Sequence, residues 1–313
     1  MRITVALGGN ALLKAGQEGT VGEQLVNLRL ACRQLVELAR EHDLVITHGN
    51  GPQVGKILLQ NEMAADQTPA MPLDVCGAMS QGQIGYLLQQ ELHRAMVAAG
   101  SPHEVVTLIT RVLVDPDDPS FQNPTKPIGS FYSAEVAAHY MKEKNETWIE
   151  DSGRGWRKVV PSPQPQRLLE EKVIKQLVQS SCLVIASGGG GIPVVEEPGG
   201  GYQGIEAVID KDLAAALLAD AVESQLLLIL TDVPGAYLHY GTPNQQLLGE
   251  VTIEEIASYA AAGHFAAGSM GPKVEAAIRF VSRGKGRCAI ITALDSATRA
   301  LQGKAGTRVV AVL

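Results

Sequence analysis

Three glycine-rich clusters each follow a short apolar run in this chain of 313 residues. They are LGGNA at 7–11, HGNGP at 48–52 and SGGGG at 187–191. In an open α/β sheet, ligands bind at the carboxyl ends of the strands, where glycine lets backbone N–H groups approach a phosphate or carboxylate. One such cluster is as readily a tight turn, but three of them together favour an anion-binding site.

Three lysines stand in restrained settings: Lys126 in NPTKPIG, Lys211 in IDKD and Lys273 in GSMGPK. A transferring phosphoryl group spreads negative charge over its oxygens, so fixed cations around it catalyse without a covalent intermediate. Asp212 directly follows Lys211 at an expected helix start, where its carboxylate could hold lysines in place. Spacing alone does not show that the three lysines converge, and a solvated surface cation is the commoner alternative for any one of them.

Other motifs carry less information. The chain has no Walker A sequence and no glycine loop of the protein-kinase type. A G-x-G-x-x-G match at 199–204 follows EEP rather than a strand, so we interpret it as a turn. His48 is favoured as a structural histidine over a proton shuttle. TDV at 231–233 follows an apolar run, where either a nucleotide or an ordinary turn is expected.

Composition excludes several classes of protein. The 26 basic and 33 acidic residues give a net charge of −7, which argues against nucleic acid because that partner demands a basic face. The four cysteines form no C-x-x-C pair, which argues against a zinc site or a disulfide framework. No apolar run approaches the roughly 18 residues of a membrane span. We therefore expect a cytoplasmic protein with no membrane partner and no metal-ligating residues of its own.

Apolar runs alternate with amphipathic stretches along the chain, which predicts a mostly parallel sheet covered by helices on both sides. Near-continuous apolar runs of this kind are typical of strands buried on both faces. The expected strands are 3–7, 44–47, 105–114, 183–186, 207–209, 226–230, 289–292 and 309–312. The expected helices include 53–65, 79–99, 213–222, 254–262 and 274–282. Thr252 with Glu255 forms a capping box for the fourth of these helices.

The stretch from Asp115 to Pro165 interrupts this alternation with DPDDP, NPTKPIG and PSPQP. Strand-like TWIED and RKVV inside it favour a small folded flap over a long surface loop, with Trp148 and Trp156 expected to be exposed. A second boundary is expected near Asp210. The chain is therefore predicted to form two lobes, 1–210, which includes a flap at about 115–165, and 211–313.

Motifs over nearly the whole length give a specific resemblance. The chain resembles the carbamate kinases of the amino acid kinase family. The matching segments, in order, are ALGGNALL, THGNGPQVG, PLDVCGAMSQGQIGY, NPTKPIG, EDSGRGWRKVVPSPQP, SGGGGIPVV, EAVIDKDLA, LTDV, GHFAAGSMGPKVEAA and ALQGKAGTRV. NPTKPIG with RGWRKVVPSP is similar to the protruding subdomain that separates carbamate kinases from other members.

The resemblance implies a three-layer αβα sandwich with a mainly parallel central sheet and a small protruding flap subdomain, usually in a homodimer. It implies a phosphotransferase that catalyses ATP + carbamate ⇌ ADP + carbamoyl phosphate with Mg²⁺, working toward ATP formation in arginine catabolism. The N-terminal lobe would bind carbamate or carbamoyl phosphate, and the C-terminal lobe the nucleotide.

The same resemblance assigns expected roles to residues. Lys126, Lys211, Asp212 and Lys273 would be catalytic. The phosphoryl and substrate contacts would be Gly8, Gly9, Asn10, Gly49, Asn50, Gly51, Ser187, Gly188 and Gly189. Nucleotide contacts would come from Lys211, Thr231, Asp232, Gly268, Met270 and Lys273.

Two positions depart from the family pattern: Ser130 and Ala267 stand where proline is common. Neither change removes a charged group. Two alternatives remain: another phosphotransferase of the amino acid kinase family, and a nucleotide-binding regulator that has lost catalysis.

Overall fold

The computed structural model describes residues 1–14, 16–101, 103–144, 146–151, 153–266 and 268–312. Ala267 lies outside the described residues, as do the side chains of Asn10 and Ser130. Within the described part, eight strands form the central sheet in the order β15-β17-β16-β12-β1-β2-β9-β3. Each neighbouring pair is parallel except β16 with β17. The predicted mainly parallel sheet is therefore confirmed.

The two halves of this sheet come from the two parts of the chain. On one side lie β1 (Arg2–Leu7), β2 (Asp43–His48), β9 (Leu183–Ile185) and β3 (Val105–Thr107). On the other lie β12 (Leu226–Thr231), β16 (Cys288–Ala293), β17 (Thr307–Val310) and β15 (Glu250–Thr252). The two halves join where β1 pairs with β12. The carboxyl ends of strands from both parts of the chain therefore meet near the middle of the sheet.

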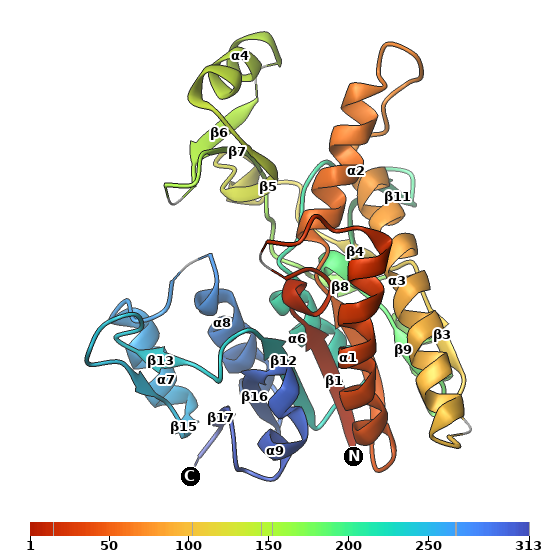
Figure 1. Cartoon of the computed structure of the whole chain (residues 1–313), viewed down its shortest axis with the longest axis vertical. Helices are drawn as coiled ribbons and strands as arrows, with labels where there is room; N and C mark the ends of the chain where they lie inside the picture. The colour runs from red at the N-terminus through yellow and green to blue at the C-terminus, as the bar shows by residue number, and fades with distance from the viewer. Residues whose placement is uncertain (15, 102, 145, 152, 267, 313) are drawn as a thin grey trace.

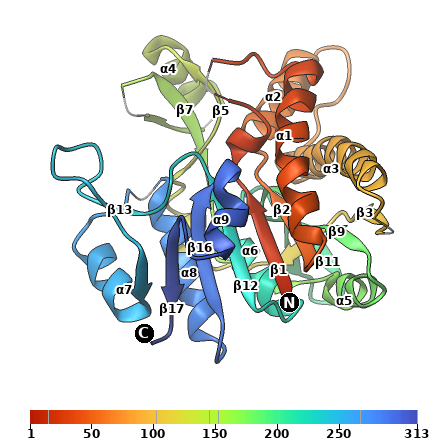
Figure 2. The same cartoon turned by 60° about the horizontal axis from the view of Figure 1, so that its bottom comes forward.

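Helices cover both faces of the central sheet. Side chains along β1 alternate between the two faces, and those on both faces are buried. Ile3, Val5 and Leu7 face a core shared with α1 (Val21–Ala39), α3 (Leu73–Ala98) and α9 (Ala297–Leu301). Ala6 faces the opposite core, built on α6 (Lys211–Ala221) and α8 (Met270–Ser282). On that second face α5 (Glu171–Gln179) and α7 (Ile253–Ala261) complete the layer. Figure 2 shows the sheet between these layers, which confirms the three-layer αβα sandwich.

A small antiparallel sheet forms the flap, which we define as residues 126–160. Its strands lie in the order β5 (Lys126–Tyr132), β7 (Trp156–Val160), β6 (Thr147–Glu150), with α4 (Ala134–Lys144) between β5 and β6 in sequence. The flap protrudes from the body beside α2 (Gly51–Met63) (Figure 1). The expected exposure of Trp148 is wrong: only 8% of it is exposed, because it stacks on Tyr140 with ring centroids 5.6 Å apart.

A second small sheet lies beside the main one. It has the order β11 (Tyr202–Gly204), β10 (Ile192–Glu196), β4 (Arg111–Leu113), β8 (Arg167–Leu168). The G-x-G-x-x-G match lies in the hairpin between β10 and β11, where Gly200 and Gly201 have φ of +84° and +109°. This confirms the interpretation as a turn. A further hairpin pairs β13 (Tyr237–Leu238) with β14 (Gln246–Leu247).

Two strand predictions are wrong. The run 105–114 splits into β3 and β4 in different sheets, because the amide N–H of Thr110 donates to Oε1 of Gln81 instead of continuing a ladder. Ala207 and Ile209 are buried and Val208 is half-buried, but the run 207–209 lies outside the strands of the described chain, in the connection to α6. The N–H of Val208 donates there to the carbonyl of Pro161. The capping box of Thr252 with Glu255 at the start of α7 is confirmed.

Candidate active site

Two glycine clusters meet at the carboxyl edge of the central sheet. Gly8 follows β1 and Gly49 follows the parallel strand β2. A Cβ atom on Gly8 would lie 2.8 Å from the carbonyl oxygen of Leu230, and one on Gly49 would lie 3.2 Å from Cδ of Lys211 and 3.5 Å from N of Gly9. Larger residues would therefore separate the two loops from each other and from Lys211.

The third glycine cluster packs against the second. A Cβ atom on Gly188 would lie 2.5 Å from the ring of His48, and one on Gly189 would lie 2.1 Å from Nδ2 of Asn50. Gly189 also has φ of +68°, and Ser187 has φ of +55°, a region that L side chains rarely adopt. All three clusters therefore lie together, as the sequence predicted.

The polar groups of these loops indicate a ligand-binding site. Asn50 precedes α2 without capping it through its side chain. Pro52 has no N–H, so the backbone N–H groups of Gly51 and Gln53 are the ones at this helix start that can bind a ligand. Nδ2 of Asn50 instead donates to Oγ of Ser80 at 2.8 Å. Oγ of Ser187 is buried without a partner among the described residues, although the backbone carbonyl of Ser187 accepts from Oγ1 of Thr47.

His48 lies beneath these loops as a neutral group. Burial lowers the pKa of its imidazole to about 4. Its Nδ1 lies 3.0 Å from the carbonyl oxygen of Gly49, so a neutral ring with the proton on Nδ1 donates to that carbonyl. This arrangement supports the structural role over the proton shuttle.

Lys211 and Lys273 share one carboxylate. Nζ of Lys211 lies 2.5 Å from Oδ1 of Asp212, and Nζ of Lys273 lies 3.1 Å from Oδ2. Burial acts to raise the pKa of Asp212, but the two ammonium groups outweigh it and lower the pKa to about 2. Asp212 is therefore ionised at neutral pH and holds two lysines in fixed positions, as the sequence suggested.

Lys126 binds a different carboxylate, which sequence reasoning missed. Its Nζ lies 2.7 Å from Oδ2 of Asp210. Oδ1 of Asp210 accepts the backbone N–H groups of Asp212 and Leu213, so Asp210 is the N-cap of α6. An aspartate directly before a helical pattern is the sequence signal of such a cap. The three lysines thus converge on the start of α6, held by the two acidic residues on either side of Lys211.

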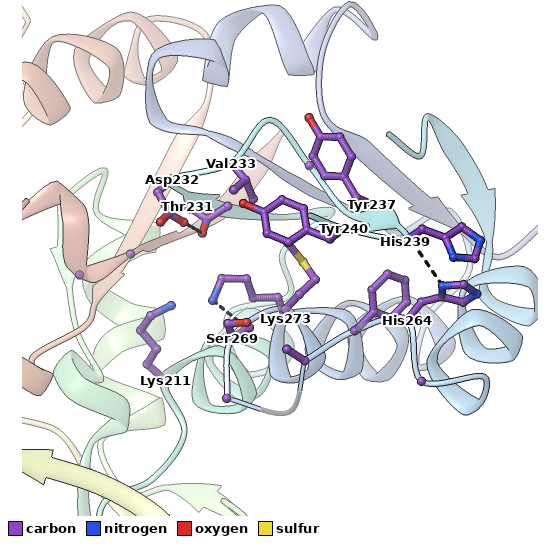
Figure 3. A pocket seen from close by; sticks show the side chains of 18 of the residues that line it. Lys211, Thr231, Asp232, Val233, Tyr237, His239, Tyr240, His264, Ser269 and Lys273 are labelled. Carbon is purple, nitrogen blue, oxygen red and sulfur yellow. Dashed lines mark hydrogen bonds between the residues drawn. The ribbon is translucent and has the colours of Figure 1, made fainter. Parts of the chain in front are cut away.

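A cavity of about 910 Å³ opens from this cluster into the C-terminal part of the chain. One end of the cavity holds Lys211 and Lys273 together with Thr231 and Asp232, and the other end holds Tyr237, His239 and His264 (Figure 3). Of the residues predicted to be near phosphate or nucleotide, the lining includes Gly8, Gly9, Lys211, Thr231, Asp232, Gly268, Met270 and Lys273.

The aromatic end of this cavity was not predicted. It is lined by Tyr237, Tyr240 and Phe265 together with two histidines, His239 and His264, whose ring centroids lie 4.6 Å apart. The signal was available, because aromatic residues are only 4% of the chain and they gather at 237–240 and 259–265. A cavity with cations at one end and aromatic rings at the other suits a nucleotide.

Acidic residues near the lysines do not form a metal cage. Within the described ranges, no three His, Cys, Asp or Glu side chains gather closely enough to hold a metal ion. Mg²⁺ commonly binds through substrate phosphates with one or two carboxylates rather than in an all-protein cage. The donor set is therefore compatible with Mg²⁺ that arrives on a nucleotide.

The comparisons with known proteins agree with this geometry. Residues 1–292 match the model of the amino acid kinase family. The chain belongs to this family. Among curated members, it is 54% identical to the carbamate kinase of Pyrococcus horikoshii, with 98% of each chain covered, and 52% identical to that of Thermococcus kodakarensis, with 99% of each covered.

A solved structure of the family extends the likeness to three dimensions. Carbamate kinase from Giardia lamblia bound to AMP-PNP matches with a TM-score of 0.92 and 47% identity, over 99% of this chain and 98% of that one. The expected resemblance to carbamate kinases is confirmed, and with it the expectation of a phosphotransferase. Within the described residues, no helix of the present chain is long and apolar enough to cross a membrane.

Proposed function

We propose that this chain is a carbamate kinase, catalysing ATP + carbamate ⇌ ADP + carbamoyl phosphate. The observation that carries the proposal is the convergence of Lys126, Lys211 and Lys273 on the first turn of α6. That turn lies between the glycine loops and the large cavity. Full-length similarity to carbamate kinases supports the choice of substrate.

The nucleotide belongs in the cavity on the C-terminal side. Thr231, Asp232, Gly268 and Met270 line it, and we assign 211–313 as the nucleotide-binding lobe. Mg²⁺ would arrive with the nucleotide substrate and would neutralise charge on its phosphates. The aromatic end then receives the base, and the lysine end receives the phosphates.

The other substrate belongs at the glycine loops of the N-terminal lobe, 1–210. Carbamate is small, planar and anionic. The backbone N–H groups of Gly51 and Gln53, at the start of α2, favour such an anion. Asn50, the hydroxyl of Ser187, which has no partner among the described residues, and the backbone of Gly188 and Gly189 lie in the neighbouring loops and would supply further polar contacts.

The transfer itself needs no side-chain nucleophile. In the ATP-forming direction, a β-phosphate oxygen of ADP attacks the phosphorus of carbamoyl phosphate, and the bond from phosphorus to the carbamate oxygen breaks. Negative charge on the equatorial oxygens grows between the lysines, each of which contributes on the order of 4 kcal/mol of attraction at about 4 Å and an effective dielectric of about 20. Asp210 and Asp212 hold the ammonium groups in place beforehand.

We assign the ATP-forming direction in arginine catabolism as the cellular role, because an acyl phosphate can drive ATP synthesis. We also propose that the chain acts in the cytoplasm as a homodimer.

The test is ATP formation from ADP and carbamoyl phosphate, with and without Mg²⁺. We expect Mg²⁺-dependent turnover, and much slower turnover with acetylglutamyl phosphate or with UMP as the phosphoryl acceptor from ATP. Preference for either of these substrates would assign another activity of the family. Tight nucleotide binding without any consumption of carbamoyl phosphate would indicate a regulator that has lost catalysis.

A further inference from the structure

The flap contacts the body of the molecule where β5 packs against α2. A Cβ atom on Gly55 of α2 would lie 2.5 Å from Cα and 2.7 Å from N of Gly129 in β5. Both of those atoms are backbone, so no flexible side chain is there to move aside. The two elements touch backbone to backbone at this point.

Gly129 is itself held firmly within the flap. It has φ of +73° and lies where the pairing of β5 with β7 shifts register. Arg157 of β7 donates from Nε to the carbonyl of Gly129 at 3.2 Å and from Nη2 to the carbonyl of Pro127 at 3.3 Å. A displacement of Gly129 is therefore passed on to both strands.

Apolar side chains surround the glycine pair. Val54 and Ile57 of α2 share a buried cluster with Ile128 and Val160 of the flap. The flap is thus seated on α2 by a packed contact, and Gly55 is the position in α2 that lets the two backbones approach.

This contact lies between two parts of the proposed site. Four residues before Gly55, α2 begins at Gly51 in the HGNGP loop. Three residues before Gly129, β5 begins at Lys126, whose ammonium group pairs with Asp210. We infer that Gly55 is a positioning residue for phosphoryl transfer, because its contact with Gly129 sets the place of Lys126 relative to the glycine loops. The inference rests on the proposed function of Lys126.

A methyl group on Gly55 would push the flap away. The gap of 2.5 Å would have to widen by about 1 Å to reach an ordinary contact, and a misplacement of about 1 Å in an active site can cost on the order of 10² in rate. Alanine is the better helix former, so α2 itself does not lose stability through the change.

The test compares Gly55→Ala with Gly82→Ala. Gly82 also lies inside a helix, α3, but a Cβ atom there would meet nothing within 4 Å. We expect Gly55→Ala to lower kcat for ATP formation by about 10- to 100-fold. The KM for ADP should stay within about twofold, because no described residue of the flap lines the nucleotide cavity. Gly82→Ala should leave both values unchanged.

Tryptophan fluorescence provides a readout that does not depend on activity. The two tryptophans of the chain, Trp148 and Trp156, both lie in the flap, and Trp148 lines the same small cavity as Gly55 and Gly129. We expect a red shift of the emission in folded Gly55→Ala and none in Gly82→Ala. Adding Gly55→Ala to Lys126→Ala should lower kcat by less than about threefold more.

The inference would be overturned if folded Gly55→Ala had the kcat of the wild type. It would also be overturned if Gly55→Ala lowered kcat by the same factor in Lys126→Ala as in the wild type. If Gly55→Ala does not fold, Leu58→Ala loosens the same contact without crowding it. It should then shift the emission and lower kcat, and unchanged values would overturn the inference as well. If the wild type forms no ATP, the proposed function fails, and the fluorescence comparison still decides whether Gly55 seats the flap.

Discussion

Lys126 and Asp210 form an ion pair of 2.7 Å across 84 residues of sequence. The lysine belongs to the flap and the aspartate to the first turn of α6, so the pair joins the flap to the centre of the site. Asp210 uses its other oxygen to cap the helix that carries Lys211 and Asp212. One carboxylate therefore aligns the flap lysine with the other two cations.

The substitution Asp210→Asn should keep the N-terminal cap of α6 but remove the charge that holds Lys126. Asparagine caps helices as well as aspartate does, so the free energy of unfolding should change by less than about 1 kcal/mol. The ion pair with Lys126 is partly exposed and adds little to the stability of the fold, but without it the ammonium group of Lys126 is no longer held in place, so kcat should fall by about tenfold or more. Steady-state kinetics and urea unfolding check both parts. In a double-mutant cycle with Lys126→Ala, fully additive effects would contradict the pairing.

Each of the three lysines should be needed for turnover. Removal of one electrostatic donor to a transition state typically costs about 10² to 10³ in rate, so we expect such losses of kcat in Lys126→Ala, Lys211→Ala and Lys273→Ala, with the fold retained by circular dichroism. Lys172→Ala, on the exposed face of α5, is the control. A kcat near normal in Lys211→Ala would remove that residue from the proposed mechanism.

The sequence predicted the strands that are buried on both faces. The run at 226–230 is apolar throughout because α6 and α8 cover one side of β12 and α1 covers the other. The run at 207–209 is also apolar, and Ala207 and Ile209 are buried, yet it is not a strand, because apolar residues and burial do not by themselves provide a neighbouring strand to pair with. The break at Thr110 depends on the side chain of Gln81, 29 residues away, which periodicity does not reveal.

The site was predictable in its parts but not in its pairings. Lys126, Lys211 and Lys273 stood out by their neighbours, and the glycine clusters by their place after strands. Which carboxylate receives which lysine depends on where the flap, packed on α2, places Lys126. The sequence pattern IDKD contains both acids, and only the fold separates Asp210, which receives Lys126, from Asp212, which receives the other two lysines.

The close packing of Gly189 on Asn50 predicts a substrate-side defect. In Gly189→Ala, the new methyl group would meet Nδ2 of Asn50 at 2.1 Å, in a backbone region with φ of +68°. We expect a loss of about 1–3 kcal/mol in the free energy of unfolding and a rise of at least about tenfold in the KM for carbamoyl phosphate.

The KM for ADP should remain unchanged in that variant. Gly199→Ala, in the β10–β11 hairpin with nothing within 4 Å of a Cβ atom, is the control and should behave as wild type in all three measurements. Equal behaviour of the two variants would mean that the glycine loop at 187–191 is only a turn.

The buried imidazole of His48 predicts a dependence of stability on pH. Burial lowers its pKa from 6.5 to about 4 in the folded chain. The unfolded chain therefore binds a proton between these values that the folded chain does not. The stability associated with neutral His48 is fully present above about pH 6.5 and is lost as the pH falls toward 4, by about 3 kcal/mol in all.

The variant His48→Asn should lack this dependence, because its amide does not titrate, while its N–H can still donate to the carbonyl of Gly49. Urea unfolding at several pH values between 7.5 and 4 measures the difference between the two proteins. We expect the wild type to be the more stable one at pH 7.5 and the gap to narrow by about 3 kcal/mol at pH 4. A gap that stays constant over this range would show that His48 is protonated in the folded chain as readily as in the unfolded chain.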